Sequence, residues 1–204
     1  MVEPDQPSRQ GGERMDQRRT DTREQIQSVA LELFAEKGYD RASLRGIAER
    51  LHVTKAALYY HFRTKEDILA SVIEDFLLQL DTLVKWAHGQ PSDVDVREEV
   101  LRRYSALLTG RTAQLARFMR EGMAKIPELA LGLKIRAHFA ALIDVLAGPG
   151  ESTENRLRAQ VALAALQLAT LSDPDLEPAG DETDRRAAAL KIATELVQPS
   201  TPAP

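Results

Sequence analysis

Apolar residues recur three and four positions apart in successive stretches of the chain, as they do along the buried face of a helix. No stretch after Pro91 alternates apolar and polar residues as a half-buried strand does, and no internal repeat is visible. The pattern therefore predicts an all-α fold. We expect helices over about residues 22–37, 44–51, 54–62, 65–88, 94–109, 112–125, 127–146, 153–171 and 182–198.

Two of the shortest helical patterns stand next to each other near the N-terminus. The first follows Ser43 and the second opens at Thr54, and both residues suit an N-cap because their side-chain oxygens accept hydrogen bonds from free backbone N–H groups. Only His52 and Val53 separate the two patterns. A helix, a tight turn and a second short helix make up a helix-turn-helix. Its apolar positions are Leu44, Ile47, Ala48, Leu51, Leu58 and Phe62.

The second helix of this pair carries side chains that suit a DNA groove. Its two apolar residues hold it against the protein, and the remaining residues face outward. A lysine near the helix N-terminus reaches base acceptors or a phosphate, and tyrosines bond phosphate oxygens while their rings lie against sugars or thymine methyls. The alternative is a solvated surface helix whose aromatic rings fold back onto the protein. The outward residues are Lys55, Ala57, Tyr59, Tyr60 and His61, with Arg63 just beyond them.

Residues 22–69 resemble the DNA-binding domain of the TetR family of bacterial transcriptional repressors. The most diagnostic part is the string from Leu58 to Phe62, LYYHF, followed by Lys65. At the position of His52 the family usually has Gly, which adopts a positive φ easily. His52 therefore either strains the turn or adds a phosphate contact. The other matching residues are Ala30, Leu33, Phe34, Gly38, Tyr39, Ser43, Leu44, Ile47, Ala48, Val53 and Leu69.

The resemblance implies DNA contacts at eight positions. Arg45, early in the first helix of the pair, corresponds to a base or phosphate contact. Lys65 corresponds to a phosphate contact, a role that the N-terminus of the following helix also favours. The other positions are Thr54, Lys55 and Ala57, which face base edges, and Tyr59, Tyr60 and His61, which hold the backbone or thymine methyls.

In the family, the helix that begins at about Lys65 transmits ligand binding to the DNA-binding heads, and the helices after it enclose a ligand. The resemblance therefore implies a small-molecule effector in the C-terminal half. The few aromatic residues and scattered polar groups of this half suggest a mostly aliphatic pocket, and hence an apolar effector. Methionine and aromatic side chains suit such a cavity, although at helical spacing each of them is also an ordinary core residue. The candidates are Trp86, Tyr104, Leu108, Phe118, Met119, Met123, His138 and Phe139.

The last two predicted helices are rich in apolar residues. The stretch VALAALQLATL, residues 161–171, is apolar on nearly every face, and a helix of this kind must be buried all round. In the family the last two helices pair with their symmetry mates as a four-helix bundle. We therefore expect a homodimer whose interface includes Leu163, Leu166, Leu190, Ala193, Leu196 and Val197.

Composition excludes several other classes of protein. The formal net charge is −4, and the chain has no cysteine, hence no disulfide framework and no thiolate metal site. No apolar run approaches the length of a membrane span and the N-terminus lacks a signal-peptide core, so we expect a cytoplasmic protein with no membrane partner. The sequence contains no P-loop, nucleophile-elbow or zinc-peptidase motif, and its four histidines are scattered. We therefore expect no catalytic residue, no metal and no cofactor.

The composition also changes along the chain. We expect a disordered tail over residues 1–20, a DNA-binding domain over 21–67, a helical ligand-binding and dimerisation domain over 68–198 and a disordered tail over 199–204. Met15 is an alternative to Met1 as the translation start.

Together these features predict a homodimeric repressor that binds double-stranded operator DNA and is released by a small-molecule effector. Two alternatives stay open. One is a regulator that acts as an activator or uses its ligand as a corepressor. The other is a helical ligand-binding protein or enzyme in which the DNA-binding module is vestigial.

Overall fold

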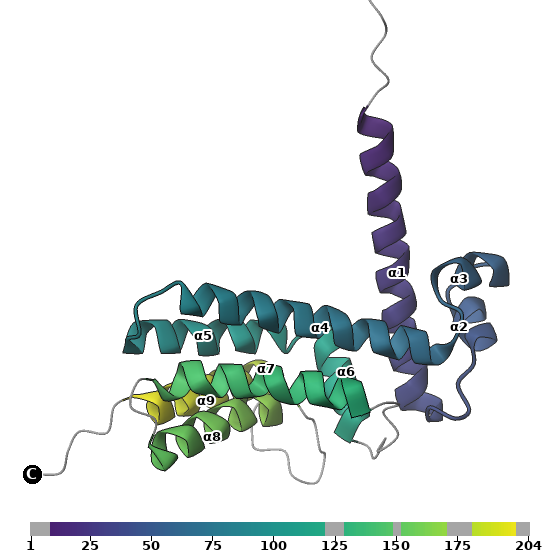
Figure 1. Cartoon of the computed structure of the whole chain (residues 1–204). Coiled ribbons are helices and arrows are strands. Elements are labelled where there is room, and N and C mark those ends of the chain that lie inside the picture. Colours follow the sequence, from purple (N-terminus) through teal and green to yellow (C-terminus); the bar gives the residue numbers. More distant parts are fainter. Residues whose placement is uncertain (1–8, 121–128, 149–151, 171–180, 199–204) are drawn as a thin grey trace, which may run out of the picture. The chain divides into compact units, whose positions relative to one another are not determined.

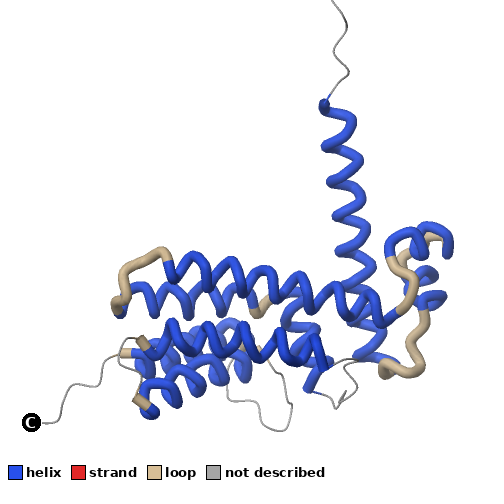
Figure 2. The backbone as a smooth tube through the Cα atoms, viewed as in Figure 1, coloured by secondary structure: helices blue, strands red, loops and turns tan. Residues whose placement is uncertain are grey.

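The computed structural model describes residues 9–120, 129–148, 152–170 and 181–198. Within these ranges every regular element is a helix, and no strand occurs (Figure 2). The chain divides into two compact units, one ending at Leu69 and the other beginning at Ala70. The helices are α1 (Arg9–Lys37), α2 (Leu44–Arg50), α3 (Lys55–His61), α4 (Lys65–His88), α5 (Val94–Leu107), α6 (Gly110–Arg120), α7 (Leu129–Ala147), α8 (Thr153–Ala169) and α9 (Glu182–Val197), as labelled in Figure 1.

The N-terminal unit is held together by one apolar stripe of α1. Ile26, Ala30 and Phe34 recur on this stripe at four-residue spacing and are almost completely buried. The unit also buries Ile47 of α2 and Leu58 of α3, and α2 contacts both α1 and α3. These contacts build the three-helix module that the sequence predicted.

The two ends of α1 differ in how well the sequence predicted them. The helix ends at Lys37, and Gly38 follows with φ 79°, a left-handed conformation that glycine adopts without strain. Its N–H donates to the carbonyl of Phe34 at 3.0 Å and closes the last turn. The helix begins at Arg9, however, and not at about Thr22. Residues 9–20, expected as part of a disordered tail, are helical, and residues 1–8 lie outside the described residues.

In the C-terminal unit, α8 and α9 pack against each other, α5 also packs on α9, and α7 packs on α8 (Figure 1). Small residues line the contact faces of α8 and α9, since Ala159, Ala162, Ala189 and Ala193 are all buried. Alanines at these positions let two helix backbones approach closely. The broad apolar pattern of these helices is therefore partly explained by packing within one chain.

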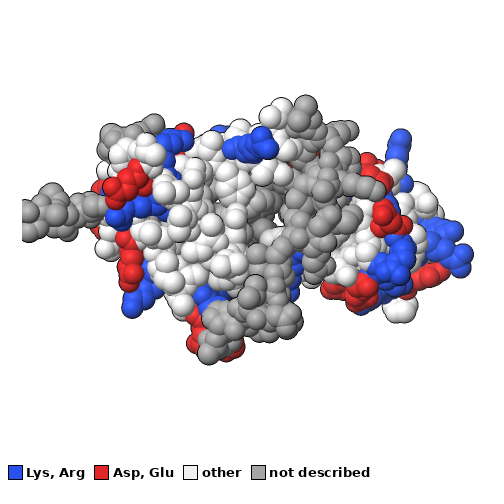
Figure 3. All heavy atoms as spheres, turned by 90° about the horizontal axis from the view of Figure 1, so that it is seen from below, with Lys and Arg blue, Asp and Glu red and all other residues white. Residues whose placement is uncertain are grey.

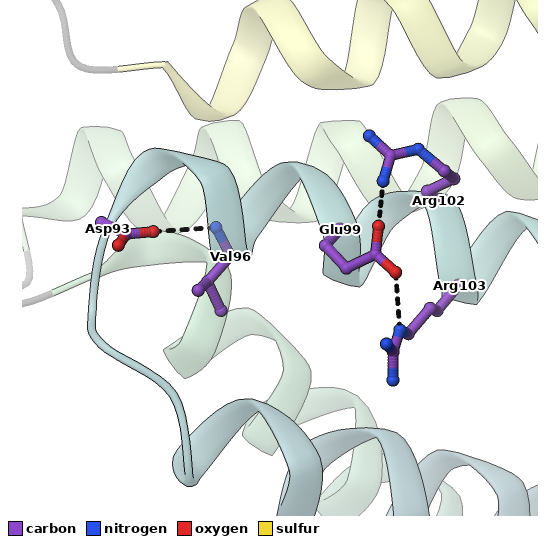
Figure 4. A network of polar contacts seen from close by, with 5 residues as sticks. All are labelled: Asp93, Val96, Glu99, Arg102 and Arg103. Atoms are coloured by element: carbon purple, nitrogen blue, oxygen red, sulfur yellow. Dashed lines mark hydrogen bonds and ion pairs between the residues drawn. The ribbon is translucent and has the colours of Figure 1, made fainter.

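The start of α5 is fixed by local polar contacts (Figure 4). The carboxylate of Asp93 caps the helix by accepting from the Val96 N–H at 2.9 Å. One turn later, Glu99 accepts from Arg103 at 2.8 Å and also pairs with Arg102. These two arginines, Arg103 first, hold the pKa of the Glu99 carboxyl below its usual range. The guanidinium of Arg103 lies 3.7 Å from the centre of the Trp86 ring, which joins α5 to α4 by a cation–π contact.

Within the described ranges, none of the helices combines the length and the apolar character needed to cross a membrane.

Candidate nucleic-acid interface

Both short helices of the N-terminal unit are capped by the residues that the sequence predicted. The Ser43 hydroxyl accepts from the Gly46 N–H at 3.2 Å, and the Thr54 hydroxyl accepts from the Ala57 N–H at 3.2 Å. Each helix has only seven residues, so such a bond satisfies a substantial part of its free N-terminal donors. The caps fix where α2 and α3 begin, and hence which side chains α3 turns outward.

The turn between α2 and α3 is a Schellman motif with histidine in place of glycine. His52 has φ 55°, the left-handed conformation that glycine adopts most easily. The Val53 N–H donates to the Ala48 carbonyl at 3.1 Å, and the His52 N–H donates to the Glu49 carbonyl at 3.2 Å. These are the two bonds that define the motif. The predicted strain at His52 is therefore present in the backbone.

Helix α3 is anchored on one side and exposed on the other. Leu58 is fully buried and Phe62, which follows the helix, is 3% exposed. The ring of Phe62 also receives the guanidinium of Arg23 from α1, 4.9 Å from the ring centre. Tyr59 and Tyr60, by contrast, are 51% and 66% exposed, far more than tyrosines usually are in a folded protein.

The structure places six of the eight predicted contact residues together on α3 and its cap. Thr54, Lys55, Ala57, Tyr59 and Tyr60 are exposed. His61 is partly buried, and its ring meets the ring of Tyr60 edge to face, with centroids 5.3 Å apart. Two phenols and an ammonium group are therefore exposed on one short helix.

Lys65 has a different environment from the one expected. Its ammonium group donates to the Tyr39 carbonyl at 2.7 Å and lies 4.2 Å from the centre of the Tyr39 ring. The carbonyls of Asp40 and Ala42 are at 3.4 and 3.5 Å. The charge is thus directed into the turn between α1 and α2. The family resemblance implies a phosphate contact for this ammonium group, and in the structure the group binds carbonyls of the turn.

The Tyr39 side chain completes this arrangement. Its hydroxyl donates to the Glu66 carboxylate at 2.9 Å, and its ring packs edge-on against Phe34 with centroids 5.0 Å apart. Burial, followed by the hydrogen bond and charge of Glu66, raises the pKa of Tyr39 well above its ordinary value. The first turn of α4 is therefore tied to the end of α1 by both Lys65 and Glu66.

Arginines on α2 are engaged with carboxylates. Arg45 is exposed and pairs with Glu49 at 2.7 Å, so a bond from Arg45 to DNA has to compete with this partner. Arg50, which the sequence analysis missed, donates two bonds to Glu36 of α1, at 2.6 and 2.8 Å. The bond from Arg50 lowers the pKa of the Glu36 carboxyl. The local sequence does not predict the pairing of Arg50 with Glu36, because these two residues are 14 positions apart along the chain.

Three of the eight predicted ligand-binding residues belong to the core of the C-terminal unit. Tyr104, Leu108 and Phe118 are buried, as the core interpretation expected. Trp86, His138 and Phe139 are partly exposed. The side chain of Met119 and the whole of Met123 lie outside what the structure describes.

Tyr104 also has a polar partner within this core. Its hydroxyl accepts from the Gln167 side chain at 2.8 Å, and Phe139 meets its ring edge to face with centroids 6.3 Å apart. Burial raises the pKa of Tyr104 well above its ordinary value.

The predicted dimer-interface residues need a correction. Leu163, Leu166, Ala193 and Val197 are each less than 5% exposed within a single chain, so they cannot present an open face to a partner. Leu190 and Leu196 are only partly exposed. The helices are apolar on several sides, and the sequence pattern does not distinguish the inner side from the outer one.

A different set of apolar residues is exposed on the same two helices. Leu157, Val161 and Leu168 of α8 are 57%, 45% and 68% exposed, and Ile192 of α9 is 51% exposed. With the exposed Ala164, the α8 residues follow the four-three-four spacing of one helix face. Helix α8 is the lowest helix of its unit in Figure 1, and the view from below shows few charged side chains across the middle of this unit (Figure 3).

Within the described part of the chain, His, Asp and Glu side chains form no group of three that could hold a metal ion.

The fold and this interface define the class: an all-helical protein with an N-terminal helix-turn-helix. Residues 26–72 match the family described as bacterial regulatory proteins, tetR family. This part of the chain therefore matches the family, and the resemblance carried by the LYYHF segment is confirmed.

Individual relatives agree with this assignment. The biofilm operon icaADBC HTH-type negative transcriptional regulator IcaR from Staphylococcus epidermidis is 39% identical over 37% of this chain and 48% of that protein. The HTH-type transcriptional regulator AcrR from Shigella flexneri is 41% identical over 26% of this chain and 25% of that protein. The chain thus spans about half and about a quarter, respectively, of the lengths of these curated relatives.

Similarity to a solved structure extends much further. The TetR family transcriptional regulator PfmR from Thermus thermophilus superposes with a TM-score of 0.58 and 25% identity, covering 82% of this chain and 96% of that chain. The predicted all-α fold class, with its helix-turn-helix module, is confirmed.

Proposed function

We propose that this protein is a sequence-specific DNA-binding regulator of transcription, and that α3 is its recognition helix. The observation that carries this proposal is the asymmetry of α3: Leu58 is buried, whereas Tyr59 and Tyr60 are more than half exposed. Two adjacent exposed phenols are costly for solubility unless a partner covers them. The curated relative IcaR, a negative transcriptional regulator by name, favours repression as the mode of action.

The exposed groups of α3 have complementary roles on a duplex. Lys55, in the first turn, reaches a base acceptor or a phosphate, and the hydroxyls of Tyr59 and Tyr60 bond phosphate oxygens. Thr54 remains the cap of the helix, with its hydroxyl accepting from the Ala57 N–H. Arg45 shares its charge with Glu49, so its contact with DNA is weaker than its charge alone suggests.

Two copies of the chain are needed to read an inverted repeat. We propose that the dimer forms through the exposed stripe of α8, Leu157, Val161 and Leu168, together with Ile192 of α9. An exposed row of large apolar residues along one helix face is typical of a self-association surface. A two-fold dimer then presents two α3 helices to successive major grooves, about 34–36 Å apart.

We further propose that a small molecule bound in the C-terminal unit releases the protein from DNA. The cluster of Tyr104, Gln167 and Phe139 supports this proposal, because it combines a buried hydroxyl–amide pair with an aromatic edge. A coupling free energy of about 1–3 kcal/mol between effector and operator sites changes operator affinity about 5–150-fold. The single tryptophan, Trp86, lies under Arg103 and gives a fluorescence signal for ligand binding to this unit.

The decisive experiment is selection of bound duplexes from a random DNA pool at physiological salt, followed by affinity measurements on the enriched sequence. We expect an inverted repeat, and Tyr60→Ala should weaken specific binding by at least about 1 kcal/mol, the size of a base-pair discrimination. Lys85→Ala, a change of an exposed lysine that pairs with Asp81 on α4, is the matched control and should leave affinity unchanged.

Each alternative predicts a different result in the same experiment. A vestigial DNA-binding module predicts no enriched sequence from folded protein, and identical binding by wild type and Tyr60→Ala. A regulator that requires a corepressor predicts enrichment only after ligand is added.

A further inference from the structure

A cavity of about 380 Å³ opens at one end of the C-terminal helical bundle. Its walls come from four helix ends: the first turns of α5 and α8 and the last turns of α7 and α9. None of the residues predicted to bind the apolar effector lines it. It is therefore separate from the Tyr104 cluster, and its size falls within the range of small-molecule sites, about 300–1,000 Å³.

Two arginines give this cavity a positive charge. Arg97 of α5 and Arg158 of α8 both line it, and among the described residues of the lining Glu154 is the one acidic side chain, so their formal charge is +1. Arg158 bonds Glu154 at 2.9 Å, which keeps this arginine extended along α8. The side-chain amide of Asn155 and the positive end of the α8 dipole add further attraction for an anion.

Arg97 is positioned by its surroundings without being neutralised by them. Its Nε donates to the Asp93 carbonyl at 3.3 Å, and the guanidinium lies against Gly148, where an added Cβ would be 3.4 Å from Nη1. No ion pair joins Arg97 to a carboxylate of the described residues. The planar fork of an arginine held in this way matches the two oxygens of a carboxylate.

Ser92, Gly148 and Gln198 also line the cavity, and its remaining lining residues are apolar. Leu146 and Ala147 at the end of α7 and Leu196 and Val197 at the end of α9 line it. Leu196, predicted as a dimer contact, thus faces a cavity of its own chain. A charged wall beside a short apolar wall suits a ligand with an anionic head and a few methylene groups, and does not suit a purely apolar molecule or a free inorganic ion.

From this arrangement we propose that the cavity at the ends of α5, α7, α8 and α9 binds a small aliphatic carboxylate, with Arg97 and Arg158 holding the carboxylate group and α7 and α9 covering the chain. The site is independent of the DNA-binding face and of the Tyr104 cluster.

The test is calorimetric titration of the full chain with hexanoate, in the absence of DNA, with hexan-1-ol as an uncharged ligand of the same chain length. We expect saturable hexanoate binding and no comparable binding of hexan-1-ol. Arg97→Gln should weaken hexanoate binding about tenfold or more, since it removes a charge-assisted bond. Arg102→Gln, on the same helix but outside the cavity, is the control and should bind as wild type does.

Two results would overturn the proposal: no saturable binding by folded wild-type protein, or equal binding by wild type and Arg97→Gln. If Arg97→Gln loses its helical circular dichroism, Arg158→Gln replaces it in the same comparison. Because no DNA is present, the outcome does not depend on whether the proposed DNA-binding function is correct.

Discussion

Replacing Lys65 by Met separates the role seen in the structure from the phosphate contact suggested by the family resemblance. Methionine keeps most of the apolar stem over the Tyr39 ring but removes the ammonium group. The bond to the Tyr39 carbonyl at 2.7 Å is then lost, together with the cation–π contact at 4.2 Å. A hydrogen bond to a charged group contributes about 1.5–3 kcal/mol. An exposed cation–π contact adds about 0.5–1 kcal/mol.

Solvent reduces this sum, because Lys65 is partly exposed and water can reach the freed carbonyls. We therefore expect the N-terminal unit to lose about 2 kcal/mol of stability, a factor of about 30 in its opening equilibrium. Native-state hydrogen exchange followed by mass spectrometry measures this directly. Peptides from residues 26–69 should exchange faster by about this factor, and peptides from α5 should not change.

The salt dependence of operator binding provides the second readout. A lysine that contacts phosphate contributes about 0.9 to the slope of log affinity against log salt concentration. If Lys65 stabilises the turn, Lys65→Met leaves this slope unchanged, whereas Lys55→Met on α3 reduces it and leaves exchange unchanged. A Lys65→Met protein with normal exchange and a reduced slope would refute the structural role.

Three further predictions concern other parts of the chain. His52→Gly should be more stable than His52→Ala by about 1 kcal/mol in chemical denaturation, because only Gly adopts φ 55° without strain; equal stabilities would contradict this explanation of the turn. Leu168→Glu should give a monomer in sedimentation at concentrations where wild type is a dimer, whereas Leu78→Glu, an equally exposed site on α4, should not; a dimeric Leu168→Glu protein would exclude the α8 stripe. Glu99→Gln should reduce the loss of stability on acidification. The pKa of Glu99 is lowered in the folded protein, so the ionised carboxylate stabilises the fold at pH values above the ordinary carboxyl pKa of 4.5. This stabilisation is lost as the pH falls through the pKa that Glu99 has in the folded protein. Thermal melting from pH 6 to pH 3 compares the two proteins, and parallel curves would show that the Glu99 contacts contribute nothing.

The sequence predicted helices well where apolar spacing and caps agree. Ser43 and Thr54 start their helices as expected, because an N-cap acts within three residues of itself. The start of α1 was predicted wrongly, because a local capping signal does not mark the start of this helix. Thr22 and Gln25 have the spacing of a capping box, yet the helix runs through them from Arg9. A polar stretch without proline suits a solvated helix as well as a tail, and local sequence does not decide between them.

In the candidate site, the sequence predicted features that depend on neighbouring residues and not those that depend on distant ones. The exposed residues of α3 could be predicted, because Leu58 and Phe62 fix which side is buried. The environment of Lys65 could not, since it depends on carbonyls 23 to 26 positions earlier in the chain. The exposed face of α8 could not be predicted from the sequence either, because this helix is apolar on nearly every face. Which face is buried is decided by the helices that pack against it within the chain.

The buried alanines between α8 and α9 have a consequence for evolution. Ala162 and Ala193 are completely buried, so a larger residue at either position costs about 1–3 kcal/mol of overpacking or displaces one helix against the other. The same two helices carry Leu157, Leu168 and Ile192 on their outer sides. A displacement inside the chain would therefore change the spacing of the proposed partner-facing surface. In the proposed dimer, residues buried within one chain would thus constrain how two chains meet, and a change in half-site spacing could begin with a single methyl group in the interior.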